Sequence, residues 1–125
     1  MIYSQQYDPS DCGPACLSMI LSSFGRTSTI TELRSLSGTD VSGTTFFGLK
    51  QAVEKCGLEA VAVKCEISQI DGEILPCIAH IVPKDNKNTD HYVVIRKVKD
   101  KKLQIWDPNP EKGKHWVSDD EFGQE

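Results

Sequence analysis

The sequence predicts an α+β domain in which a group of helices is followed by an antiparallel sheet. Up to about residue 57 the apolar residues recur at helical spacing, whereas from about residue 58 they alternate or form short strand-like runs. Turn-forming residues separate those later runs, as hairpins require. Helices first and strands afterwards are typical of α+β folds. We therefore expect a single domain over residues 1–125, with a helical part at about 1–57 and a sheet part at about 58–125.

The first helix is predicted to follow a turn that carries a cysteine. The stretch QYDPSDCGPACL places Cys12 among turn-forming residues, and Pro14 suits the first helical position, where a missing N–H costs nothing. The apolar residues that follow keep helical spacing as far as Phe24, and Gly25 supplies the stop. Cys12 is therefore expected at or just before a helix N-terminus, where unpaired N–H groups and the helix dipole stabilise a thiolate.

Two more helices are predicted before the pattern changes. Residues 29–36 form the first of them, with a capping box made by Thr29 and Glu32 and a stop at Gly38. The second extends over about residues 44–56. Its apolar residues, which mostly share one face, are Phe46, Phe47, Leu49, Val53 and Cys56. Gly48 is expected to weaken this helix by about 1 kcal/mol relative to alanine.

The second half of the chain has the pattern of short strands. The predicted strands cover residues 58–65, 77–82, 91–98 and 103–107, with an edge strand at Trp116 and Val117. The strands at 91–98 and 103–107 flank a charged turn and are expected to pair as an antiparallel hairpin. Residues 118–121 have the spacing of a capping box, so we expect this chain to be the front portion of a longer protein.

The composition is that of a soluble globular domain. The net charge of −4 argues against a nucleic-acid surface, and the lysines that do cluster lie around the predicted hairpin turn beside Asp100. No apolar run approaches the ~20 residues that span a bilayer. An odd number of cysteines, five, and a polar start favour a reducing, cytosolic compartment over a disulfide framework.

Four of the five cysteines are expected to be packing residues: Cys16, Cys56, Cys65 and Cys77. The spacing of Cys12 and Cys16 is not Cys-x-x-Cys, and no second cysteine or histidine pair follows at zinc-ligand spacing. We therefore predict no metal site and a nucleophilic role for Cys12.

A nucleophilic cysteine needs a base, and His91 is the best candidate among three histidines. His115 lies near a charged edge and is expected at the surface, while His80 lies within a short apolar strand and is expected in the core. His91 opens a strand directly after a polar loop, from which its side chain can project into a cleft.

Asp107 is the best candidate to orient His91, under a structural condition. A three-residue loop at 99–101 would bring Asp107 opposite Val93, diagonal to His91 on the same sheet face. A two-residue loop would put the two side chains on opposite faces unless a bulge intervened. The alternative for Asp107-Pro108 is a turn that only ends the strand.

An acyl-transfer site also needs two donors for the oxyanion. The N–H of Cys12 can supply one, and the side-chain amide of Gln6 or Gln5 can supply the other; spacing alone does not choose between these glutamines.

The candidate residues occur in an order that matches a known family. They are Gln6, Asp8, Asp11-Cys12-Gly13-Pro14-Ala15-Cys16-Leu17, His91-Tyr92-Val93-Val94 and Asp107-Pro108. This order resembles the papain-like peptidase domain of bacteriocin-processing ABC transporters, which removes double-glycine leaders. The resemblance implies Gln6 as oxyanion donor, Cys12 as nucleophile, His91 as general base and acid, and Asp107 as orienter.

The resemblance also implies a substrate and partners. The substrate would be a precursor peptide cut after a Gly-Gly pair, with the leader set into an apolar groove for which Phe46, Phe47 and Tyr92 are candidates. The partners would be membrane-spanning and ATP-hydrolysing domains, so that this domain lies at the cytoplasmic face of a bacterial membrane. No cofactor is expected here, since ATP and Mg²⁺ would serve only the ATPase domain. The alternatives are a non-catalytic docking module and another papain-like acyl transferase.

Overall fold

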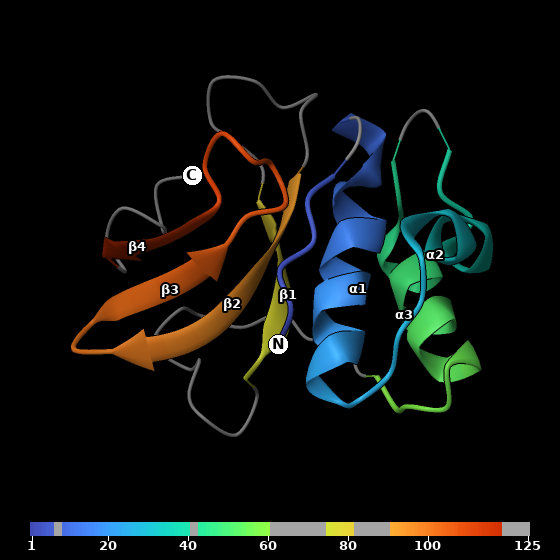
Figure 1. Ribbon diagram of the computed structural model, residues 1–125, viewed down its shortest axis with the longest axis horizontal. Coiled ribbons are helices and arrows are strands. Elements are labelled where there is room, and N and C mark those ends of the chain that lie inside the picture. The colour runs from blue at the N-terminus through green and yellow to red at the C-terminus, as the bar shows by residue number, and fades with distance from the viewer. Residues whose placement is uncertain (7–8, 41–42, 61–74, 82–90, 119–125) are drawn as a thin grey trace.

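Helices and strands occupy separate sides of the molecule, as Figure 1 shows. The structure is a computed structural model that describes residues 1–6, 9–40, 43–60, 75–81 and 91–118. Within these residues three α-helices pack on a four-stranded antiparallel sheet. The predicted α+β fold is confirmed.

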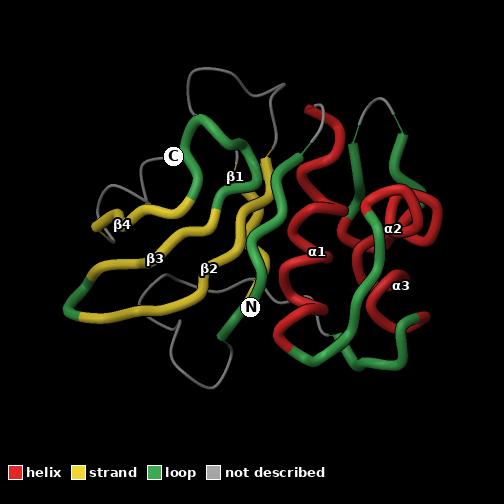
Figure 2. Tube along the Cα trace, viewed as in Figure 1, coloured by secondary structure: helices red, strands yellow, loops and turns green. Residues whose placement is uncertain are grey.

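The first helix is the centre of the fold. A 3-10 turn, η1 (Pro9–Asp11), leads directly into α1 (Cys12–Ser23), which is followed by α2 (Ile30–Ser37) and α3 (Phe46–Lys55). Helix α1 lies between the sheet on one side and the α2–α3 pair on the other (Figures 1 and 2). Most of its residues are buried, because it is covered from both sides.

The sheet has the simplest antiparallel topology, with strands in chain order. The strands are β1 (Cys77–Ile81), β2 (His91–Lys99), β3 (Lys102–Trp106) and β4 (Lys114–Ser118). The predicted hairpin and the edge strand at Trp116 and Val117 are both present (Figure 2). The side of the sheet that carries Tyr92, Val94 and Trp106 shares a core with α1. A second apolar cluster is formed by Val93, Ile95, Leu103 and Ile105.

The start of α1 differs from the prediction at Pro14. Cys12 is itself the first helical residue, so Pro14 is the third residue rather than the first. The helix accepts a proline there because the N–H groups of its first turn have no intrahelical partner in any case. At the other end, Gly25 has a φ of +74°, as expected for a helix stop.

The ends of α2 and α3 follow the sequence signals. The hydroxyl of Thr29 accepts the N–H of Glu32 at 3.1 Å, and Gly38 ends α2 in the left-handed conformation at a φ of 69°. Gly48 has a packing role that outweighs its poor helix propensity. A Cβ at this position would lie 2.1 Å from the carbonyl oxygen of Ser37, so only glycine allows α3 to approach α2 this closely.

Two aromatic residues on α3 are more exposed than the helical pattern predicts. Phe46 and Phe47 were expected on the same face as the buried Leu49, yet they are 50% and 70% exposed. They occupy the first turn of α3, whereas Leu49 and Ala52, further along the helix, are buried in the core.

The hairpin between β2 and β3 has a two-residue turn rather than the three-residue loop that was the first of the two cases considered from the sequence. Lys99 pairs with Lys102, and the intervening Asp100 and Lys101 have φ values of 52° and 63°. Positive φ at both central residues defines the type I′ turn, whose twist matches that of paired strands.

The predicted strand at 58–65 falls mostly outside the described residues, and 58–60 form no strand. The capping box predicted at 118–121 lies outside them beyond Ser118. Among the described segments, no helix has the length and hydropathy needed to cross a membrane.

Candidate active site

Cys12 lies at the first position of α1 and is 4% exposed. The 3-10 turn η1 delivers the chain into the helix, so the Cys12 N–H belongs to the group that has no partner within the helix. The thiol of Cys12 and a backbone N–H without an intrahelical partner therefore lie together, next to the start of β2.

His91, at the first position of β2, lies between a carboxylate and a thiol. Its Nε2 lies 2.6 Å from Oδ1 of Asp107, and Cys12 also acts electrostatically on the ring. Because Nε2 is engaged by Asp107, Nδ1 is the ring nitrogen left for the thiol. Burial lowers the pKa of His91, but the hydrogen bonds and negative charges of Asp107 and Cys12 more than offset it and raise the pKa to about 9. The ring is therefore set up to carry a proton.

The carboxylate of Asp107 is held in place by its own loop. Asp107 is 3% exposed and follows directly after β3. Its Oδ1 accepts the N–H of Asn109 at 2.8 Å, and its backbone N–H donates to the carbonyl of Gly113 at 3.0 Å. The aspartate both contacts the His91 ring and forms a turn, so the two roles considered for it from the sequence are compatible.

A bulge in β2 brings His91 and Asp107 together. The pairing passes from Ile95–Ile105 directly to Lys97–Gln104, which leaves Arg96 as an extra residue. The extra residue compensates for the shorter turn, so that Val94 pairs with Trp106 and the next residue, Asp107, comes level with Val93. The hairpin therefore combines a two-residue turn with a bulge, the second arrangement that lets His91 and Asp107 share a sheet face.

The two candidate glutamines have different surroundings. The backbone N–H of Gln6 donates to the carbonyl of Pro108 at 2.8 Å, which ties this residue to the loop after Asp107. Its side-chain Oε1 is buried and makes no hydrogen bond within the described part of the chain. Gln5 is exposed and lines a different cleft. The geometry favours Gln6 of the two.

Two of the three candidate groove residues, Phe46 and Tyr92, belong to a partly exposed aromatic cluster, and Phe47, the next residue of α3, is 70% exposed. The ring of Phe46 meets those of His80 and Tyr92 edge-on, with centroids 5.1 Å and 5.7 Å apart. Tyr92 itself is buried, and its hydroxyl donates to the carbonyl of Thr44 at 2.8 Å. His80 was expected in the core, and it is half-buried on β1 within this cluster. Tyr92 thus supports Phe46 from beneath and presents little surface itself.

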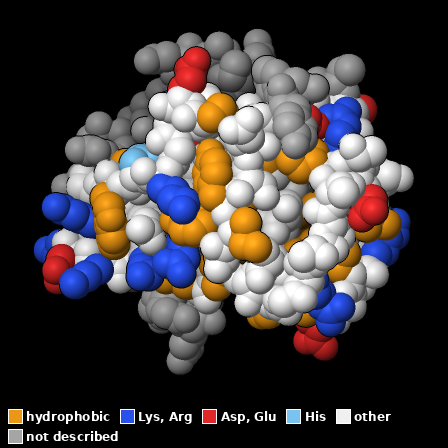
Figure 3. Space-filling view, in the orientation of Figure 1, with side chains coloured by type: hydrophobic (Ala, Val, Ile, Leu, Met, Phe, Trp, Pro, Cys, Tyr) orange, Lys and Arg blue, Asp and Glu red, His pale blue; other side chains and the backbone are white. Residues whose placement is uncertain are grey.

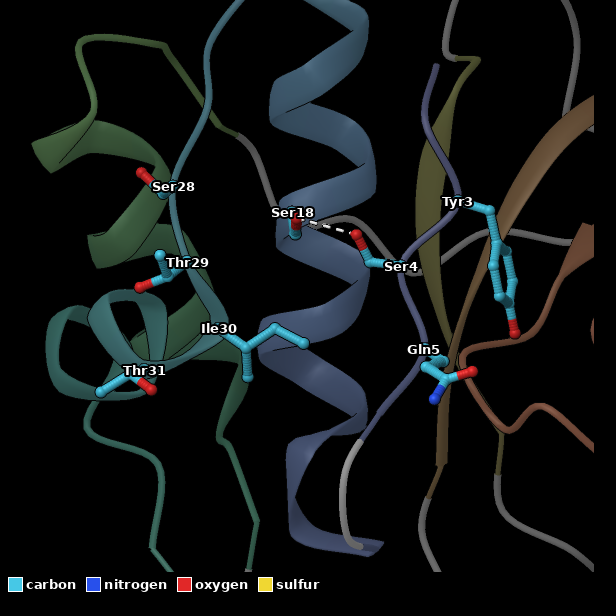
Figure 4. Close-up of a pocket in the computed structure, with 8 residues that line it drawn as sticks. All are labelled: Tyr3, Ser4, Gln5, Ser18, Ser28, Thr29, Ile30 and Thr31. Atoms are coloured by element: carbon cyan, nitrogen blue, oxygen red, sulfur yellow. Dashed lines mark hydrogen bonds between the residues drawn. The ribbon is translucent and has the colours of Figure 1, made fainter.

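A separate cleft of about 440 Å³ runs along α1, away from the candidate triad. Figure 4 shows it between the N-terminal segment and the start of α2, with the hydroxyls of Ser4 and Ser18 joined at 2.9 Å across its floor. Its lining residues are Tyr3, Ser4, Gln5, Ser18, Ser28, Thr29, Ile30 and Thr31. The cleft has no charged side chain and no nucleophile other than hydroxyls, so we assign it no part in the chemistry.

Cys16 and His115 have surroundings that indicate a structural role, whereas Cys65 lies outside the described residues. Cys16 is fully buried four residues along α1, and burial, followed by the charges of Cys12 and Asp107, raises the pKa of its thiol well above the usual value. His115, expected at the surface, is half-buried and its Nδ1 lies 3.0 Å from the carbonyl of Gly113. Within the described residues, no three acidic, histidine or cysteine side chains are grouped so that they could hold a metal ion.

Two supporting contacts were not anticipated from the sequence. The hydroxyl of Tyr3 donates to the backbone carbonyl of Asp107 at 2.5 Å, and the buried carboxylate of Asp11 forms an ion pair with Arg34 of α2. The partners are 104 and 23 residues apart in the chain, and no local pattern signals such pairs.

The helices packed on an antiparallel sheet, with the cysteine at the start of α1 facing a histidine of β2, define the class of papain-like cysteine peptidases. The sequence profile of the peptidase C39 family matches residues 1–125. The chain belongs to the peptidase C39 family, a family of cysteine peptidases.

Relatives with known names agree with this assignment. The chain is 45% identical over 127 aligned positions to the lactococcin-G-processing and transport ATP-binding protein LagD of Lactococcus lactis subsp. lactis, covering 100% of this chain and 17% of that protein. The peptidase domain of Streptococcus ComA, a bifunctional ABC transporter of a quorum-sensing pathway, superposes with a TM-score of 0.90 at 33% identity, covering 99% and 92% of the two chains. A double-glycine motif protease from an AMS/PCAT transporter, solved with its leader peptide, gives a TM-score of 0.79 at 26% identity, covering 97% and 81%.

Proposed function

We propose that this chain is a cysteine endopeptidase that removes the leader from precursor peptides after a Gly-Gly pair, in support of export by an ABC transporter. The observation that carries the proposal is that Nε2 of His91 lies 2.6 Å from the Asp107 carboxylate while Cys12 helps to raise the pKa of the same ring. A thiol, a raised-pKa imidazole and a buried carboxylate in this order are the parts that acyl transfer by cysteine requires.

In the proposed reaction His91 takes the thiol proton, and the Cys12 thiolate attacks the carbonyl carbon of the second glycine. The oxyanion of the tetrahedral intermediate accepts the N–H of Cys12 and the side-chain amide of Gln6. Collapse of the intermediate breaks the C–N bond, and the imidazolium of His91 protonates the leaving amine to give a thioester. Water, deprotonated by His91, then hydrolyses the thioester and releases the leader with a free carboxylate. Asp107 holds the ring and stabilises its positive charge throughout.

We propose that the site selects glycine at the cleavage position and has an apolar docking surface beside it. Glycines can enter a cleft in which any Cβ would clash, so selectivity can come from exclusion. Phe46 and Phe47 expose large apolar rings next to Tyr92, the residue that follows His91, and we propose that they receive the leader. The relative solved with its leader peptide supports this substrate class.

The wider setting is proposed from the relatives. The chain spans 17% of the length of the first of them, a processing and transport ATP-binding protein. We propose that residues 1–125 act as the peptidase domain of a longer transporter, at the cytoplasmic face of a bacterial membrane. Membrane-spanning and nucleotide-binding domains would then be its partners, and ATP and Mg²⁺ would serve only the latter.

The test is incubation of the chain with a precursor peptide that carries a double-glycine leader, followed by mass spectrometry. We expect two products separated after the second glycine, and none with Cys12→Ala, which deletes the nucleophile and little volume. Equal cleavage by Cys12→Ala would refute the role of Cys12. Leader binding without cleavage by the unsubstituted chain would favour a docking module instead. Transfer of the acyl group to an added amine in preference to water would favour an acyl transferase.

A further inference from the structure

The residue before the nucleophile is a buried carboxylate whose charge is balanced from another helix. Asp11 is 4% exposed and precedes Cys12 directly. Its Oδ1 forms an ion pair with Nη1 of Arg34, which also donates to the hydroxyl of Ser10 at 3.0 Å. A buried charge is stable only when it is paired, so this contact fixes where the carboxylate points.

The carboxylate does not take the position that a helix-capping aspartate usually takes. Asp11 is the N-cap residue of α1, but its φ of −93° and ψ of 4° are not those of an extended cap, and its side chain caps no N–H group. If it did cap α1, an anionic oxygen would lie among the donors that we propose for the oxyanion. The pair with Arg34 turns that oxygen toward α2 instead.

We propose that Arg34 is a positioning residue for the nucleophile, acting through Asp11. It keeps the Asp11 carboxylate away from the N–H groups that begin α1, and it cancels a negative charge one residue from the Cys12 thiolate. This inference rests on the proposed cysteine peptidase function, in which a thiolate and an oxyanion form at this helix end.

Several other groups lie near Cys12, and substitutions at Asp11 or Arg34 leave them in place. Cys12 acts electrostatically on His91 of β2 and on Cys16, which lies one turn along α1, and Asp107 follows β3. From β1, His80 contacts Phe46 and Tyr92. The charged residues of α3 that the structure describes, Lys50, Glu54 and Lys55, lie on its exposed side. Asp11 and Arg34 are therefore the pair whose charge balance near Cys12 can be changed without altering the triad.

The test measures the rate of Cys12 alkylation by iodoacetamide against pH, together with kcat/KM for a double-glycine precursor. Arg34→Gln leaves Asp11 unbalanced and disfavours the thiolate, so the midpoint of alkylation should rise by about 0.5–1 pH unit. Asp11→Asn removes the negative charge next to Cys12, which favours the thiolate, and should lower the midpoint. The double variant should return the midpoint to within about 0.2 pH unit of the unsubstituted chain, because charge balance is restored. The acid limb of kcat/KM should move in parallel.

The control is Arg26→Gln, which removes an exposed arginine from the segment after α1 and should not shift the midpoint. An unchanged midpoint in Arg34→Gln would overturn the proposal and leave the pair a purely structural contact. Asp11→Asn is nearly isosteric, so it tests the proposal independently if Arg34→Gln fails to fold. An alkylation midpoint that stays or rises in Asp11→Asn also overturns the proposal. Alkylation needs no substrate, so these outcomes are separate from a failure of the proposed peptidase function, in which no precursor is cut at all.

Discussion

The replacement of Asp107 by asparagine removes one charge from the candidate triad and keeps its shape. Oδ1 of Asp107 accepts from His91 at 2.6 Å and from the N–H of Asn109 at 2.8 Å. The amide oxygen of an asparagine can accept both hydrogen bonds, so the turn after β3 should persist. What is lost is the negative charge beside the imidazolium.

The size of the loss follows from the pKa of His91. An increase from 6.5 to about 9 corresponds to about 3 kcal/mol in favour of the imidazolium. Asp107 and Cys12 raise this pKa together, and the hydrogen bond that the Asp107 carboxylate accepts is the larger contribution, so we assign at least half of the increase to Asp107. Asp107→Asn should then lower kcat by about 10- to 30-fold. Asp107→Ala, which also removes the acceptor, should lower kcat further, and His91→Ala should be the slowest.

The assay is the pH profile of kcat/KM on a double-glycine precursor. The Asp107 carboxylate favours the charged form of His91. Its replacement by asparagine should therefore move the alkaline limb of the kcat/KM profile from near pH 9 downward by about 1 pH unit. The free energy of unfolding should depend on pH for the same reason. A raised histidine pKa stabilises the fold fully below pH 6.5, and this contribution is lost as the pH rises through about 9. The difference in unfolding free energy between the unsubstituted chain and Asp107→Asn should therefore be largest near pH 6 and disappear above pH 9.

The matched control is Asp100→Asn, which neutralises a carboxylate at the exposed β2–β3 turn, where asparagine suits the positive φ of 52°. This variant should leave both the rate and the alkaline limb unchanged. Unaltered rates in Asp107→Ala would refute the triad and leave a Cys–His dyad. An alkaline limb that stays in place in both Asp107 variants would refute the electrostatic argument even if the rates fell.

Three further predictions concern single side chains. Gln6→Ala should lower kcat by about 10²–10³ with little change in KM, since it removes one oxyanion donor. Steady-state kinetics that find this defect in Gln5→Ala and not in Gln6→Ala would show that Gln5, not Gln6, is the donor. Gly48→Ala should destabilise the fold by about 1–3 kcal/mol in urea unfolding, because a Cβ 2.1 Å from a backbone oxygen outweighs the gain of about 1 kcal/mol in helix propensity; a stabilised variant would contradict this close approach. Iodoacetamide should label Cys12 before Cys16, whose pKa burial raises, and peptide mapping that finds Cys16 labelled first would count against Cys12 as the reactive thiol.

The sequence by itself determined the local structure that presents the nucleophile. Turn residues before an apolar helical pattern placed Cys12 at the start of α1, and capping signals at Thr29 and Gly38 bounded α2 correctly. These features could be predicted because they depend on the backbone preferences of residues within about one helical turn of each other. The order of the candidate residues, which resembles a known family, indicated the candidate triad without its geometry.

Only the tertiary structure decided how those residues meet. The two-residue turn alone would have placed Asp107 on the wrong face, and the bulge at Arg96 restored its alignment with His91. The ion pair between Asp11 and Arg34, like the hydrogen bond from Tyr3 to the Asp107 carbonyl, joins segments far apart in the chain. A bulge, a buried ion pair or a close helix contact is selected by packing across the whole fold, which a window of neighbouring residues does not contain.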